Sequence, residues 1–194
     1  RAICIFLMLA VHVYPAQTAP TLIFEGLLHP LWIVWIDILG RASVAALSFL
    51  GGYILWRQGS ARSPGTLLRG RLLSVYLPMV SWNLVVIALT VAAALAAGMG
   101  GAAMAEQLGF DGPMDALNAV FALTDYPALI PLAFLRDLVI STVIARLLMP
   151  AMHLVWAPAL AIAAAMAVTG MSEPLLLRPA ILLFVLLGVE AARR

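Results

Sequence analysis

The sequence predicts an all-α fold, a polytopic bundle of transmembrane helices. Of its 194 residues 64% are hydrophobic and only 10% are charged, and the mean hydropathy is +1.08. Soluble domains carry about 25% charged residues, so this composition excludes an ordinary soluble domain. Apolar runs near the ~20 residues that a helix needs to cross a bilayer recur along the chain. We therefore expect helices that face lipid and satisfy their own backbone hydrogen bonds.

Six apolar runs are long enough to predict membrane spans, and a seventh helix, from Met114 to Leu123, is predicted to lie on the surface or to be re-entrant. The chain starts with Arg and its first run has no polar flank, so we expect an excerpt of a longer protein. We expect one transmembrane domain over residues 1–194, incomplete at its C-terminus. The predicted spans run up to Tyr14, then from Leu31 to Trp56, Leu72 to Ala97, Ala128 to Leu148, Ala151 to Val168 and Ala180 to Ala192.

The arginines orient the predicted spans. The segment between the second and third spans has no acidic residue and four basic ones, Arg57, Arg62, Arg69 and Arg71. Short loops rich in Arg and Lys stay in the cytoplasm, so this segment is predicted to be a cytoplasmic loop. The net charge of +2 is too small to indicate a nucleic-acid partner. These observations predict a multi-pass protein whose partners include membrane lipid.

Arg1 and His12 lie in one apolar run, eleven positions apart. Eleven residues at about 100° each make about three turns, so in a helix both side chains face the same way, roughly 16 Å apart along the axis. Ionisable groups within a membrane are costly and usually functional. Alone, Arg1 reads as a cytoplasmic anchor and His12 as an interfacial histidine. Their spacing favours a functional pair.

Asp37, Arg41, Arg136 and Asp137 are predicted at a depth similar to that of His12. Asp37 and Arg41 are four residues apart and can pair, which lowers the cost of burying either. Arg136 and Asp137 are neighbours that point about 100° apart in a helix, so they need not pair with each other, and we expect them to reach other helices. A buried salt-bridge network that fixes helix register is the structural alternative for this set.

Two further features predict packing rather than chemistry. The run from Ser43 to Tyr53 is rich in small residues, which allow another helix to approach closely. Cys4 is the single cysteine, so the sequence offers no disulfide framework. No metal site and no tightly bound cofactor is predicted.

Four features, in this order along the chain, resemble the acyltransferase-3 family of bacterial inner-membrane acyltransferases, which modify extracytoplasmic glycans. Together they extend over most of the chain. The features are the Arg1 to His12 pair, the helix end Ser48-Phe-Leu-Gly-Gly-Tyr53, the segment Arg69-Gly-Arg71 leading to Tyr76-Leu-Pro78, and the helix beginning Ala133-Phe-Leu-Arg136-Asp137.

The resemblance implies a fold of about ten helices in the bacterial inner membrane, of which this chain holds a part. It also implies transfer of an acyl group, acetyl or succinyl, from cytoplasmic acyl-CoA as donor substrate to a hydroxyl of an extracytoplasmic glycan acceptor.

Roles for the polar residues follow from that activity as hypotheses. Arg1, Arg69 and Arg71 are expected to hold the phosphates of the donor. His12 is expected to act as general base on the acceptor hydroxyl, because neutral imidazole is available near pH 7. Asp37 would orient His12 or stabilise its charge. Arg41 or Arg136 would stabilise the oxyanion that forms on the thioester carbonyl, with Asp137 in the same polar cluster.

Two other classes of protein remain open from the sequence. A secondary transporter could use buried His, Asp and Arg groups as a proton or substrate path, and would predict inverted repeats and broken helices in two halves. A non-catalytic membrane subunit is the third reading. Direct transfer and a covalent acyl-histidine intermediate are both compatible with the residues.

Overall fold

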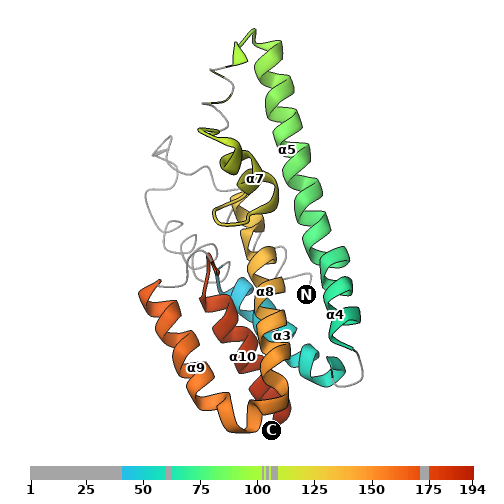
Figure 1. Ribbon diagram of the computed structural model, residues 1–194, viewed down its shortest axis with the longest axis vertical. Coiled ribbons are helices and arrows are strands. Elements are labelled where there is room, and N and C mark those ends of the chain that lie inside the picture. Colours follow the sequence, from blue (N-terminus) through green and yellow to red (C-terminus); the bar gives the residue numbers. More distant parts are fainter. Residues whose placement is uncertain (1–40, 60–62, 102, 104, 106–108, 171–174) are drawn as a thin grey trace, which may run out of the picture.

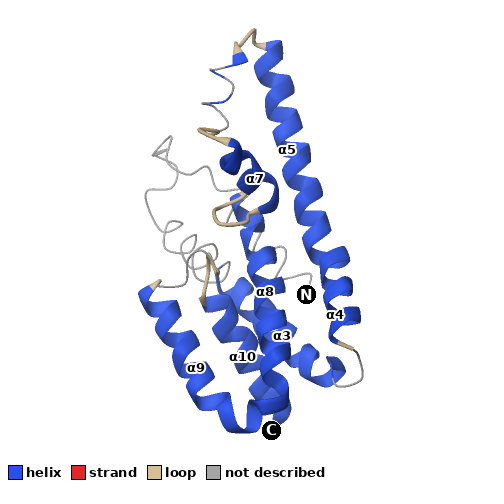
Figure 2. Ribbon diagram, viewed as in Figure 1, coloured by secondary structure: helices blue, strands red, loops and turns tan. Residues whose placement is uncertain are grey.

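The structure is a computed structural model that describes residues 41–59, 63–101, 103, 105, 109–170 and 175–194. The part so described is helical and contains no strand (Figure 2). The predicted first span and the first part of the second, with Arg1, His12 and Asp37, lie outside it. In chain order the elements are α3 (Arg41–Gly59), α4 (Pro64–Arg71), the π-helix η2 (Leu72–Tyr76), α5 (Leu77–Ala96), α7 (Pro113–Phe121), the 3-10 turn η3 (Ile130–Leu132), α8 (Ala133–Leu148), the 3-10 turn η4 (Met149–Ala151), α9 (Met152–Thr169) and α10 (Ala180–Arg193).

Helices α4 and α5 are joined through η2 into one long rod (Figure 1). Ser63 begins the rod as N-cap, where its Oγ accepts the backbone N–H of Thr66 at 3.4 Å, and a proline holds the first turn. The rod starts eight positions before the predicted span at Leu72, so the prediction of a loop around Arg69 and Arg71 is wrong. A strong capping signal outweighed the polar composition of the segment, and both arginines lie on a helix.

Two helical stretches of the described chain are long and apolar enough to cross a membrane, Gly65–Ala96 with 32 residues and Ile130–Thr169 with 40. The prediction of six or seven spans is not supported. Helix α10 has 14 residues and α7 has 9, which fall short of the ~20 that a bilayer requires. The second stretch changes direction at η4, so that α8 and α9 run in opposite directions (Figure 1).

Helix α10 lies at the centre of the lower helices and packs against α3, α8 and α9 (Figure 1). Its buried side chains, among them Val185, Leu186 and Val189, form much of the apolar core. Here the sequence prediction agrees closely, because the run Ala180 to Ala192 becomes the helix Ala180–Arg193. The ends of α7, α8 and α9 likewise fall within about five residues of the prediction.

The backbones of α3 and α10 approach each other at two glycines, one from each helix. A Cβ added to Gly52 would collide with the carbonyl of Val185, and one added to Gly188 would collide with the carbonyl of Phe49. Only hydrogen fits at both positions, so the close approach predicted from the small residues of α3 is confirmed.

Two adjacent glycines of α3 allow a controlled test of this crossing. Gly52→Ala is expected to lower the free energy of unfolding by about 1–3 kcal/mol, because the backbone of α10 must move away. Gly51→Ala is the matched control, since its Cβ would lie 3.6 Å from Leu138 Cδ1 in ordinary contact. Thermal denaturation of both variants in detergent measures the difference. Equal losses of stability in the two variants would show that the crossing is not tightly packed.

Candidate functional site

The centre of the candidate site is a buried ion pair in the first turns of α8. Arg136 Nη1 lies 2.8 Å from Asp137 Oδ1, and the two side chains are 7% and 0% exposed. The two neighbours pair, although their positions on a helix do not require it, because the long arginine side chain curls back along the helix to the carboxylate. Their other partners lie in non-helical segments rather than on the other helices that were expected.

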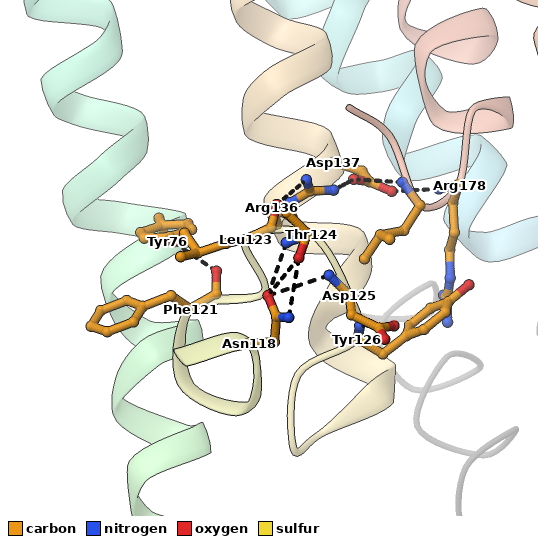
Figure 3. A network of polar contacts seen from close by, with 11 residues as sticks. Tyr76, Asn118, Phe121, Leu123, Thr124, Asp125, Tyr126, Arg136, Asp137 and Arg178 are labelled. Carbon is orange, nitrogen blue, oxygen red and sulfur yellow. Dashed lines mark hydrogen bonds and ion pairs between the residues drawn. The ribbon is translucent and has the colours of Figure 1, made fainter. Parts of the chain in front are cut away.

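Each member of the pair holds a different non-helical segment (Figure 3). Arg136 Nη2 donates to the carbonyl oxygen of Leu123 at 2.7 Å, in the loop that follows α7. Asp137 accepts the backbone N–H of Leu177 at 3.3 Å and that of Arg178 at 2.6 Å, just before α10. The ion pair therefore joins two loops that are far apart in the sequence.

The loop after α7 is organised from within by Asn118. Helix α7 ends at Ala122, whose positive φ of 51° turns the chain sharply. The side-chain oxygen of Asn118 then accepts the N–H of Thr124 at 2.9 Å and that of Asp125 at 3.4 Å. Its amide donates to Thr124 Oγ1 at 3.1 Å, so one buried asparagine fixes the start of the loop.

The rod of η2 and α5 holds the end of α7 and the same loop from outside. Asn83, which is fully buried, donates to the carbonyl of Val120 at 3.0 Å and accepts the N–H of Leu129 at 3.2 Å. The Tyr76 hydroxyl donates to the carbonyl of Phe121 at 2.8 Å. Since these contacts lie well before the end of α5 at Ala96, the loop packs alongside a membrane-length helix rather than beyond it. This position favours the re-entrant alternative for α7.

Several polar residues that build this region were not predicted from the sequence: Tyr76, Asn83, Asn118 and Arg178. The signal available for Asn83 was a lone amide within an apolar run, because a buried polar group needs partners. Ser141 is a further case, since its Oγ is buried one turn after Asp137 with no hydrogen-bond partner in the described part of the chain.

The other predicted site residues are placed only in part. Arg69 is exposed on α4 and Arg71 is half-buried at the end of that helix. Arg41 is the first residue of α3, and its side chain is not among those described. The structure therefore brings together Arg136 and Asp137, and the predicted grouping with His12, Asp37 and Arg41 stays a prediction.

The described chain is thus a helical membrane protein with a hydrogen-bonded ion pair inside its bundle. Comparison with protein families gives a match to the acyltransferase domain of the acyltransferase-3 group over residues 1–193, and the chain belongs to this family. Membership indicates acyltransferase activity in a membrane-associated enzyme. No curated protein and no solved structure matched the chain.

Removal of one member of the ion pair is expected to be severe. Asp137→Ala leaves Arg136 buried without its counter-ion and frees two backbone N–H groups, at a cost of about 3–5 kcal/mol of folding free energy. The double variant Arg136→Met with Asp137→Leu removes both charges and should recover part of that loss.

Thermal denaturation and proteolysis of membranes that contain each variant provide the measurement. A double variant that is less stable than Asp137→Ala would show that a buried, unpaired arginine is not the main cause of the loss in the single variant.

Proposed function

We propose that the protein transfers an acyl group from cytoplasmic acyl-CoA to a hydroxyl of an extracytoplasmic glycan, within the bacterial inner membrane and as a multi-pass protein. The observation that carries the proposal is family membership over residues 1–193, a range that includes both Arg1 and His12. The acyl group, acetyl or succinyl, and the identity of the acceptor are left open.

The distribution of charge supports a donor site on the cytoplasmic side. Arg57 lies in the last turn of α3, and Arg69 and Arg71 lie in the last turn of α4. Arg69 is exposed and thus accessible to a ligand. Guanidinium groups bind phosphate oxygens in bidentate fashion, and CoA carries several phosphates. We assign donor binding to Arg69 and Arg71, together with Arg1.

The chemical step that we propose uses His12 as general base. His12 accepts the proton of the acceptor hydroxyl, whose oxygen attacks the thioester carbonyl. The C–O bond forms, the C–S bond breaks, and the CoA thiolate recovers the proton from His12. Asp37 orients the imidazole and stabilises its charge while it is protonated.

The contacts of Arg136 bear on the choice of oxyanion stabiliser. Its Nη1 and Nη2 are already bound to Asp137 and to the carbonyl of Leu123. These contacts direct the Arg136 guanidinium toward the two loops. We therefore assign the oxyanion to Arg41, and we assign to Arg136 and Asp137 the positioning of the two loops beside the site.

A comparison of two histidine variants tests the proposal. Membranes that contain the full-length protein are incubated with radiolabelled acetyl-CoA or succinyl-CoA, and label in envelope glycans is counted. His12→Ala should reduce transfer by at least about 10²-fold, the usual contribution of a general base. His153→Ala is the matched control, because His153 is exposed at the start of α9.

Equal labelling in the wild type and in His12→Ala would remove His12 from the chemistry. Absence of label from the wild type with both donors would favour the transporter or the non-catalytic subunit.

A further inference from the structure

Arg146 differs from the other arginines of the described chain. It lies in the last turn of α8, its Nε is buried, and that atom has no hydrogen-bond acceptor among the residues that the structure describes. By contrast, Arg136 binds a carboxylate and a carbonyl, and Arg57 lies against the ring and hydroxyl of Tyr53. A buried N–H of a charged group without an acceptor is costly, and such groups in native proteins call for an explanation.

A carboxylate of the protein is the first acceptor to consider for Arg146 Nε, but the carboxylate at this end of the described chain already binds other arginines. The C-terminal end of α10 lies beside the turn between α8 and α9 (Figure 1), and α10 packs on α8. Glu190 of α10 binds Arg193 at 2.7 and 2.8 Å and Arg194 at 2.8 Å. Both of its oxygens are thus held by two other guanidinium groups.

The charge at this end favours an anion from outside the chain. Where α8 and α10 end, at the same end of the helices (Figure 1), three arginines, Arg146, Arg193 and Arg194, and one carboxylate, Glu190, lie in or next to their last turns, which is an excess of positive charge. The C-terminus of α8 supports the cation through its helix dipole, but a dipole offers no acceptor for the buried Nε. Arg146 is only partly buried as a residue, and a ligand that reaches the rest of its guanidinium can bind Nε once the side chain turns toward it.

We propose that Arg146 binds a phosphate oxygen of a ligand at the cytoplasmic end of α8. A phosphate presents several strong acceptors in the geometry of the guanidinium fork, and can satisfy the buried Nε together with a second N–H. Two ligands at this surface carry that chemistry. One is the CoA moiety of the donor, a source that rests on the proposed function, and the other is the headgroup of an anionic lipid.

Binding measurements on the full-length protein in nanodiscs test the assignment. In phosphatidylcholine nanodiscs, Arg146→Gln is expected to weaken binding of radiolabelled CoA by about tenfold, the equivalent of one lost charge-assisted contact. Arg193→Gln is the matched control. It removes the same charge at the same end of the molecule, from a guanidinium that already has a partner, and should change CoA binding by less than about twofold.

A second readout separates ligand binding from a structural role. Without CoA, and in phosphatidylcholine, Arg146→Gln should have a thermal midpoint equal to or above that of the wild type, because the variant no longer buries an unsatisfied charged N–H. A structural role predicts the opposite, a lower midpoint in the variant. Nanodiscs that contain phosphatidylglycerol test whether the ligand is the headgroup of an anionic lipid.

Each outcome either supports the proposal or overturns it. Weaker CoA binding in Arg146→Gln alone supports the donor phosphates as ligand. Stabilisation by phosphatidylglycerol in the wild type but not in Arg146→Gln supports the lipid headgroup. If neither CoA nor phosphatidylglycerol distinguishes the variant from the wild type, or if the unliganded variant is less stable, the proposal is overturned. Since binding is measured without transfer, failure of the proposed acyltransferase reaction would leave this test intact.

Discussion

The described structure depends on one constraint, that backbone polar groups away from water must find partners within the protein. Helices meet this requirement by themselves, but residues 122–129 are not helical and pack alongside α5, which is long enough to cross a membrane. Side chains from α5, α7 and α8 bind several of their N–H and C=O groups. Asn83, Asn118 and Arg136 supply to this irregular backbone hydrogen bonds that a helix would make within itself.

This constraint also explains why a costly ion pair lies inside the bundle. An isolated pair of charges gains little from burial, since desolvation offsets the Coulomb attraction. Arg136 and Asp137 do more than attract each other, because each also binds backbone groups of a loop that no helix could satisfy. The pair is therefore better understood as the link between the loop after α7 and the segment before α10 than as a local source of stability.

The sequence predicted the features that depend on hydrophobic periodicity and side-chain size. The all-helical class, the limits of α10 and the close approach of α3 to its neighbour follow from apolar runs and from glycine, which are local properties. The sequence did not predict contacts that depend on how far a side chain extends. The Cα–Cβ bonds of Arg136 and Asp137 point in different directions, yet the long, flexible arginine side chain still reaches the carboxylate. Tyr76 and Asn83 bind backbone groups about 40 residues away in sequence, and no local pattern indicates such partners.

The two ends of α8 present opposite electrostatic situations on one helix. In its first turns a guanidinium and a carboxylate bind each other and the backbone of two loops, so they hold the chain in place. In its last turn a guanidinium nitrogen is buried, with no acceptor in the described part of the chain. Folding alone does not account for such a group, because a shorter or apolar side chain would avoid its desolvation. A phosphate ligand of the kind that we propose for Arg146 accounts for it, because the ligand supplies the missing acceptor.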